Sequence, residues 1–230
     1  MGLGMDSDVV TDWRQKLKIL LFANSRSGST YIANGLHRCL MQTVDKDAQV
    51  ELTPSPFSTF HNYPNYVLRL FPRHIKSFIE IVNDVIPDDA IKIFLYRNDI
   101  EDQLLSKIIM DITDTANIKK IEHAPVLKEL FYNHNEHIKI IRARIRDNVW
   151  SKRILYNLFE WDHVIAYEDL QGPDKDFKFL FPNYDETWNL EKKMHTKQQK
   201  RDALVNYDSF LKHFEEELDR YNSKPWFMEN

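Results

Sequence analysis

The sequence predicts an α/β fold, a single domain with a central parallel sheet flanked by helices. Short apolar runs without helical periodicity, typical of strands buried on both faces, occur at residues 18–23, 91–96 and 163–167. Segments whose apolar residues recur at spacings of three and four, typical of amphipathic helices, lie between and after these runs. Strands that alternate with helices favour a parallel sheet covered on both faces.

The first strand, turn and helix form one continuous unit. The apolar run at 18–23 leads into the polar turn Asn24-Ser-Arg-Ser-Gly-Ser29, after which apolar side chains at 32, 36, 39 and 40 share one helical face. The chain has only five glycines. Of these, Gly28 alone stands in a polar turn between a strand and a helix, where the backbone can approach an anion.

The rest of the chain continues the alternation of strands and helices. A loop-rich stretch with prolines at 54, 56 and 64 precedes a predicted helix over 72–86. After the strand at 91–96, Asp99 is expected to cap a helix that runs to about residue 111. The spacing of apolar residues predicts a long helix, or two in sequence, over 125–160. Asn206 is expected to cap a last helix that runs to Asp219.

The composition is that of an ordinary globular protein and excludes several classes. Hydrophobic residues make up 43% of the 230-residue chain, charged residues 29%, and the formal net charge is −4. This length fits one domain over residues 1–230, with 1–14 as a flexible N-terminal segment. The slightly acidic balance argues against general nucleic-acid binding. The longest apolar run, at 19–23, is too short to cross a bilayer, so no membrane partner is expected.

The cysteine content and the N-terminus indicate the compartment. Cys39 is the one cysteine, so no internal disulfide can form, and no Cys/His spacing suggests zinc. The acidic N-terminus lacks the cationic region of a signal peptide. We therefore expect a cytoplasmic protein.

A buried strand that ends in a small polar turn before a helix is a general device for binding phosphate. The helix N-terminus presents unpaired N–H groups and a partial positive charge, and a glycine keeps Cβ out of the way of the anion. The candidate phosphate loop consists of Ser25, Arg26, Ser27, Gly28, Ser29 and Thr30. Its arginine adds a fixed cation and its hydroxyls add donors. The alternative is a polar turn that only caps the helix.

The turn differs from the phosphate loop of nucleoside-triphosphate-binding enzymes. That loop requires Gly-x-x-x-x-Gly-Lys-Ser/Thr, in which the lysine reaches the β and γ phosphates. With Gly28 at the second glycine, Ala23 takes the first position and Ser29 the lysine position, while Thr30 takes the magnesium-ligand position. The missing lysine disfavours an ATP-dependent kinase, which stays open as an alternative function.

Four segments, in the same order along the chain, resemble the sulfotransferases that use 3′-phosphoadenosine 5′-phosphosulfate (PAPS), in particular members of bacterial or viral type. Arg26-Ser-Gly-Ser-Thr30 after an apolar strand resembles the 5′-phosphosulfate loop of that family. The strand at 91–96 followed by Arg97, with Ser106 nine residues on, resembles its 3′-phosphate element. Val164-Ile-Ala-Tyr-Glu-Asp-Leu170 resembles the late strand of the family, and Lys197-Gln198 with 205–208 resembles its C-terminal basic loop and helix start.

The resemblance implies a role for each of these residues. Arg26 and the backbone N–H groups of residues 27–30 would bind the 5′-phosphate that leaves, and Arg97 and Ser106 would bind the 3′-phosphate. The basic residues between 192 and 201, Lys197 among them, would either fold over the nucleotide or form a solvated basic tail. From its position alone, Arg97 projects from the carboxyl edge of the sheet, where α/β proteins bind ligands. The alternative for this side chain is an ion pair with Asp99 or Asp102.

The resemblance further implies in-line, metal-free transfer of a sulfuryl group from PAPS to a hydroxyl or amine of a small-molecule or carbohydrate acceptor, with 3′,5′-adenosine bisphosphate (PAP) as the product. As in phosphoryl transfer, the protein would mainly position the reactants and stabilise charge. His74 is the first candidate for the general base, since many family members carry a lysine and a histidine in this region and a neutral imidazole suits the task. Arg69 would replace the lysine. His61 and Glu51 stay open as bases.

Other features of the sequence leave the function open. A third alternative is a non-catalytic protein with a nucleotide-binding fold, whose helix over 125–160 is an interaction surface. Aromatic residues at 57, 60, 63 and 66 are candidates either for an acceptor pocket or for a small satellite core. The identity of the acceptor and the oligomeric state are not encoded in any motif that we find.

Overall fold

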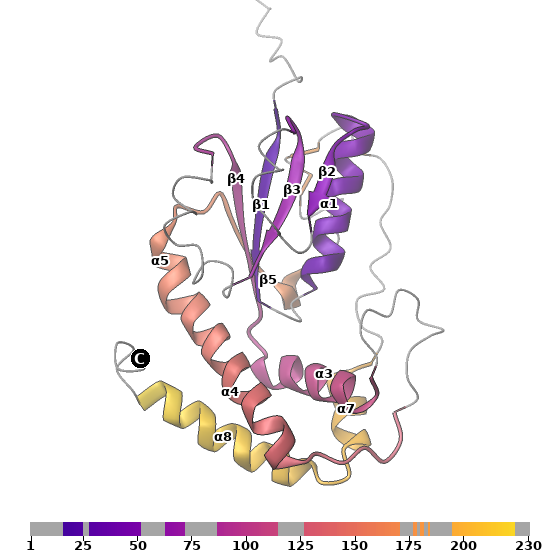
Figure 1. Ribbon diagram of the computed structural model, residues 1–230, viewed down its shortest axis with the longest axis vertical. Coiled ribbons are helices and arrows are strands. Elements are labelled where there is room, and N and C mark those ends of the chain that lie inside the picture. The colour runs from indigo at the N-terminus through magenta and orange to yellow at the C-terminus, as the bar shows by residue number, and fades with distance from the viewer. Residues whose placement is uncertain are drawn as a thin grey trace, which may run out of the picture.

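The computed structural model describes residues 16–24, 28–51, 63–71, 87–114, 127–170 and 195–223, together with 177, 178, 180, 181 and 184. Within them the predicted fold class is confirmed: an α/β fold whose five strands are all parallel, in the order β2-β3-β1-β4-β5 (Figure 1). The strands are β1 (Lys18–Ala23), β2 (Gln49–Glu51), β3 (Tyr66–Leu70), β4 (Ile91–Tyr96) and β5 (His163–Ala166).

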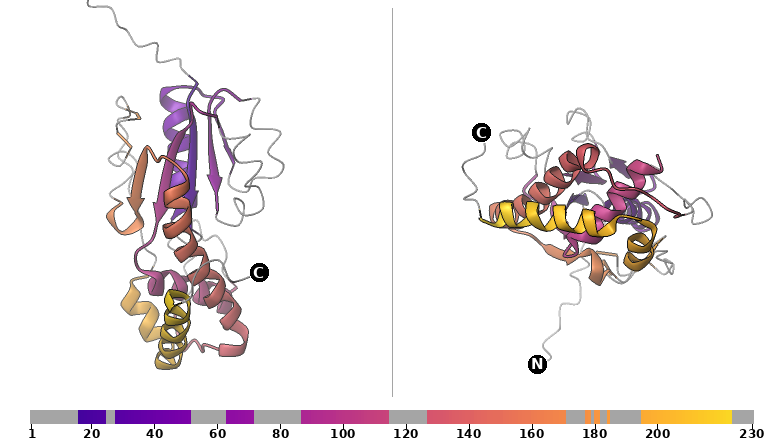
Figure 2. Two further views of the ribbon diagram at one scale, coloured as in Figure 1. Left: turned by 90° about the vertical axis from the view of Figure 1, so that its left-hand side faces the viewer. Right: turned by 90° about the horizontal axis from the view of Figure 1, so that it is seen from below.

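The helices form two groups, one on the sheet and one beyond its carboxyl edge. They are α1 (Ser29–Thr43), α3 (Ile100–Ile112), α4 (His134–Trp150), α5 (Tyr156–Leu158), α7 (Lys197–Ala203) and α8 (Tyr207–Ser223). A π-helical turn, Ser151–Leu155, joins α4 to α5, and a 3₁₀ turn, Tyr167–Asp169, follows β5. Figure 2 shows the sheet in one half of the molecule and α3, α7 and α8 in the other, with α4 extending from one half to the other.

Three apolar clusters hold these layers together. One lies between the sheet and α1 and includes Ile32 and Leu36, and a second covers the opposite face around Phe22 and Phe94. The third cluster lies beyond the sheet, where α3, α4 and α8 bury leucines, isoleucines and Phe210 against one another. Burying this much apolar surface is the main favourable term in folding. The helical group therefore has its own core, directly beneath the edge of the sheet at which the strands end.

The sequence-based prediction located three of the five strands. β2 and β3 were not predicted, because β2 has three residues and the apolar run of β3 is interrupted by Arg69. Tyr66, considered above for an acceptor pocket or a satellite core, is 2% exposed within β3 and belongs to the main core. The predicted helix at 72–86 lies outside the described residues, as do residues 1–14.

Two helix predictions need correction. The long helix expected from residue 125 begins at His134, and Phe131, which the periodicity placed on its apolar face, is 63% exposed.

Asn206 precedes α8, but its side-chain amide is hydrogen-bonded to the backbone of Tyr132 and does not cap that helix. Asn206 Oδ1 accepts from the Tyr132 N–H (2.8 Å) and Asn206 Nδ2 donates to the Tyr132 carbonyl (2.8 Å). It thereby fastens the chain before α4 to the start of α8.

Candidate functional site

The topology of the sheet selects one place for a ligand. The connection that leaves β1 leads through α1 to β2 at one edge, whereas the connection that leaves β4 leads through α3 and α4 to β5 at the other edge. Because β1 and β4 are neighbours, the topological switch lies between their carboxyl ends. Gly28 follows β1 and Arg97 follows β4, so the two predicted anion-binding elements lie on either side of this switch.

The N-terminus of α1 has the properties of an anion site. Gly28 precedes the helix in the left-handed conformation (φ 73°), and its carbonyl accepts the first helical hydrogen bond, from the Ile32 N–H (3.1 Å). The first turn contains no acidic residue, and Gly28 supplies no side-chain cap. Other helices are capped by Asp99, Asn133 or Thr196. The positive end of the α1 dipole is therefore not neutralised by a carboxylate of its own first turn.

Glycine is required at position 28 for a second reason. A Cβ placed on Gly28 would lie 2.6 Å from Cε2 of Tyr167, the first residue after β5. The same ring also contacts Arg97, whose guanidinium carbon lies 4.7 Å from the ring centroid in a cation–π arrangement. The Tyr167 ring therefore contacts both the start of α1 and the arginine that ends β4.

A second arginine lies near the start of α1. Arg69 of β3 is 8% exposed and donates from Nη1 to the hydroxyl oxygen of Thr30, in the first turn of the helix. Its guanidinium carbon also lies 4.6 Å from the centroid of the Phe71 ring. Register explains this placement: Arg69 pairs with Leu21 of β1 and, like Val67, faces α1. A cation that cannot lose its charge is therefore held next to the helix N-terminus.

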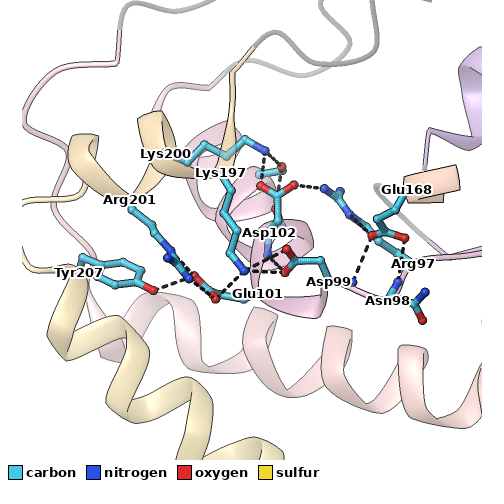
Figure 3. A network of polar contacts seen from close by, with 11 residues as sticks. Arg97, Asn98, Asp99, Glu101, Asp102, Glu168, Lys197, Lys200, Arg201 and Tyr207 are labelled. Atoms are coloured by element: carbon cyan, nitrogen blue, oxygen red, sulfur yellow. Dashed lines mark hydrogen bonds and ion pairs between the residues drawn. The ribbon is translucent and has the colours of Figure 1, made fainter. Parts of the chain in front are cut away.

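Arg97 itself is buried, at 3% exposure, and lies between two carboxylates (Figure 3). Its Nη2 is hydrogen-bonded to Asp102 in the first turn of α3, and its Nε lies 3.6 Å from Glu168 Oε1. The ion pair with Asp102 is the alternative considered above for Arg97, with the difference that the pair is buried rather than on the surface. A buried pair of this kind depends on further hydrogen bonds to satisfy the remaining polar atoms.

Lys200 of α7 supplies one of these bonds and was not predicted. Its ammonium donates to Asp102 Oδ1 (2.6 Å) and to Ser106 Oγ (2.7 Å), and Ser106 Oγ donates to the Asp102 carbonyl (2.8 Å). Arg97 and Ser106 are thus linked through Asp102: Arg97 binds the carboxylate, and Ser106 binds the backbone carbonyl. Lys200 lies 98 residues from Asp102, so only the general basic character of 192–201 indicated that α7 would contribute a cation.

Lys197 also lies at this site, but it faces the acidic start of α3. Its Nζ donates to Asp99 Oδ2 (2.9 Å) and lies 2.8 Å from Glu101 Oε2. Burial disfavours the charged forms of both groups. The hydrogen bonds outweigh this effect. Those from Arg201, Lys197 and Tyr207 lower the pKa of Glu101 to about 2, and those to Glu101 and Asp99 raise the pKa of Lys197.

Glu168 acts as an internal anion at the N-terminus of α3. Its two carboxylate oxygens accept from the backbone N–H groups of Asn98 and Asp99, each at 3.1 Å. Glu168 thus caps α3, which begins about seventy residues earlier in the chain. The N-terminus of α3 is therefore bound by a carboxylate of the chain itself, whereas the first turn of α1 contains no acidic residue.

Several predicted site residues lie outside the described part of the chain. They are Ser25, Arg26, Ser27, His61 and His74. Glu51 is described only as the last backbone position of β2. The roles assigned to these six residues stay predictions, whereas Gly28, Ser29 and Thr30 are found at the start of α1.

Comparison with protein-family models, with curated protein sequences and with solved structures found no match to this chain. Within the described residues, every helix is too short or too polar to cross a bilayer. The same residues contain no group of three or more His, Cys, Asp and Glu side chains arranged for a metal ion. The candidate function is therefore argued from the geometry of the carboxyl edge.

Proposed function

We propose that this protein is a PAPS-dependent sulfotransferase that transfers a sulfuryl group to a hydroxyl or amine. The observation that carries the proposal is the pairing of two features at one point: a helix N-terminus whose first turn has no acidic residue, and the Arg69 guanidinium on Thr30 in that turn. Backbone N–H groups and a guanidinium together favour a phosphate or sulfate group over other ligands.

The start of α1 fits the 5′-phosphosulfate end of the donor. The first turn offers backbone N–H groups without an acidic side chain, and the Thr30 hydroxyl and its guanidinium partner provide polar contacts. When bound, PAPS supplies the sulfuryl group and a phosphate as leaving group. The task of the chain is to hold that phosphate and stabilise its developing charge, which Arg26 and the α1 N–H groups would share with Arg69.

The donors at the start of α3 and on α7 fit the 3′-phosphate, but the Asp102 carboxylate competes with it for them. Arg97 and Lys200 present a guanidinium and an ammonium to the Asp102 carboxylate, and the Ser106 hydroxyl binds the same ammonium. These are donors that a phosphate uses, and Asp102 accepts from two of them. A 3′-phosphate would take over part of this donor set, so its affinity depends on how readily Asp102 gives it up.

The same geometry disfavours the two alternatives. In a magnesium-dependent kinase the hydroxyl at position 30 ligates the metal ion, but here that hydroxyl already accepts from a guanidinium. In an interaction protein that uses the predicted 125–160 helix, the apolar stripe would be exposed. Ile141 and Ile145 of α4 are instead fully buried against α3 and α8. Neither alternative explains why two arginines lie at the switch point.

A pair of ligands tests the proposal through Arg97. PAP carries the 3′-phosphate and adenosine 5′-phosphosulfate lacks it. We expect Arg97→Ala to weaken PAP binding about tenfold or more and to leave adenosine 5′-phosphosulfate within about twofold. Arg146→Ala, on the exposed side of α4 (side-chain exposure 53%), is the matched control and should change neither affinity. Equal losses for both ligands in folded Arg97→Ala protein would contradict the assigned 3′-phosphate site.

A further inference from the structure

A cavity of about 220 Å³ opens on the face of the sheet opposite α1. Phe94 and Val164, which are register partners on β4 and β5, form its floor together with Tyr96. Lys152 and Tyr156, from the π-helical turn and α5, form its side. Figure 1 shows α5 alongside β4, on the far side of the sheet from α1. The cavity is thus separate from the start of α1 and from the nucleotide site proposed there.

Aromatic rings make up most of the cavity wall. The ring of Phe94 stacks on that of Tyr96, with centroids 5.8 Å apart and planes at 19°, and its centroid lies 6.4 Å from that of Tyr156. Tyr156 is 50% exposed and Val164 is 41% exposed, so apolar surface is available to a ligand. An apolar cavity of about 150 Å³ holds a benzene molecule, so this one has room for a single ring.

Lys152 places a cation at this cavity. Its half-buried ammonium lies 5.4 Å from the centroid of the Tyr96 ring and 3.4 Å from Asn98 Oδ1, and no described carboxylate lies within ion-pair distance. Burial lowers its pKa, which the charge of Glu168 partly offsets. Lys197 and Lys200, in contrast, are both ion-paired. The π-helical turn directs Lys152 to the cavity, and such turns are frequent at functional sites.

We propose that this cavity binds a single-ring aromatic anion, such as an aromatic carboxylate, with its ring against the exposed side chains of Tyr156 and Val164 and its negative group on Lys152. A neutral aromatic ligand would leave the ammonium half-desolvated and unpaired. A small inorganic anion would leave the apolar walls in contact with water. An aromatic anion pairs with the ammonium and also covers the apolar walls. This proposal does not depend on the sulfotransferase proposal.

Three probes test this site in titrations followed by ligand-observed NMR. Benzoate and benzyl alcohol are close in size and differ in charge, and acetate carries the carboxylate without the ring. We expect benzoate to bind about tenfold tighter than benzyl alcohol, because only benzoate makes a charge-assisted hydrogen bond to the lysine. We expect acetate to bind more weakly than benzoate, because acetate has no ring to bury. Lys152→Met keeps the length of the side chain and removes its charge, so it should lower benzoate affinity about tenfold and leave benzyl alcohol unchanged. Lys152→Arg should preserve the preference for benzoate.

A second variant fills the cavity without touching the lysine. Because Val164 is 41% exposed, Val164→Trp is expected to fold and to abolish binding of both aromatic probes. Equal affinities for benzoate and benzyl alcohol in the wild-type protein would overturn the proposal, as would benzoate binding that survives both Lys152→Met and Val164→Trp. PAP titrations of the same variants report on the nucleotide site, so a failure of one proposal is distinguished from a failure of the other.

Discussion

At Gly28 two independent constraints meet, a left-handed backbone and the ring of Tyr167. The φ of 73° disfavours any residue with a Cβ, and the ring atom 2.6 Å from the Cβ position leaves no space for one. The ring in turn lies against the Arg97 guanidinium. Single-residue changes here therefore affect both anion-binding elements.

Gly28→Ala is expected to destabilise the protein by about 3 kcal/mol, the sum of typical overpacking and left-handed backbone costs. In a Tyr167→Leu background the steric part should largely disappear, so the same substitution should cost only about 1 kcal/mol. Urea unfolding of the four proteins measures this cycle. Strictly additive effects would show that Gly28 and Tyr167 are not coupled.

Glu101 provides a pH-dependent test of the α3–α7 contact. Its folded-state pKa of about 2 lies below the ordinary value of 4.5, so its ionised form stabilises the fold above about pH 4.5, and this contribution is lost as pH falls toward 2. Allowing for partial solvent screening, we expect Glu101→Gln to cost about 1 to 2 kcal/mol at pH 7 and less at pH 3. Glu215→Gln, an exposed glutamate on α8, should cost no more than about 0.5 kcal/mol at either pH. An equal cost of Glu101→Gln at pH 7 and pH 3, measured by urea unfolding, would argue against the assigned pairing.

At the level of elements, α3 and α7 form an acid–base contact across the carboxyl edge of the sheet. The N-cap and first turn of α3 supply Asp99, Glu101 and Asp102, and α7 supplies two lysines and an arginine (Figure 3). α7 is only seven residues long and is held by the capping box of Thr196 and Gln199. Its position therefore depends on these ion pairs more than on apolar burial.

Asp102→Asn is expected to be far more damaging than Asp99→Asn. Asp102 has a side-chain exposure of 2% and is shared by Arg97 and Lys200, so its neutralisation leaves two buried cations without their carboxylate, at a cost of about 3 to 5 kcal/mol. Asp99, at 33% exposure, pairs with one partly exposed lysine and should cost about 1 kcal/mol through that pair and its cap. Thermal and urea unfolding compare the two variants. Similar losses of stability in both would contradict the claim that Asp102 holds Arg97 and Lys200 in the fold.

Helices and strands could be predicted where a short stretch of sequence carries the whole pattern, and not where the structure depends on residues distant in the chain. β1 and β4 were predicted with the bounds that the structure shows, because each is an uninterrupted apolar run. β3 was missed because Arg69 interrupts its run, although that arginine faces the start of α1 and defines the candidate site. The pairing of Glu168 with the start of α3 was missed because sequence patterns do not show contacts between residues so distant in the chain.

For the whole molecule, the sheet and the helical group meet at the switch point, where the strands end and the polar residues collect. The order β2-β3-β1-β4-β5 places β1 and β4 side by side, so Gly28 and Arg97, which follow them, lie at neighbouring strand ends. The separate core of α3, α4 and α8 was not predictable, since periodicity identifies an apolar face without identifying its partner. That core supports α3 and so fixes the donors around Asp102.

Calorimetric titration of the wild-type protein with PAP, in the presence and absence of EDTA, tests the sulfotransferase proposal most directly. The anion sites proposed here consist of backbone N–H groups, guanidinium groups and an ammonium, which bind phosphate without a divalent cation. We predict one PAP bound per chain, with the same affinity whether or not EDTA is present. The absence of binding heat, or heat that disappears on chelation, would contradict the proposal.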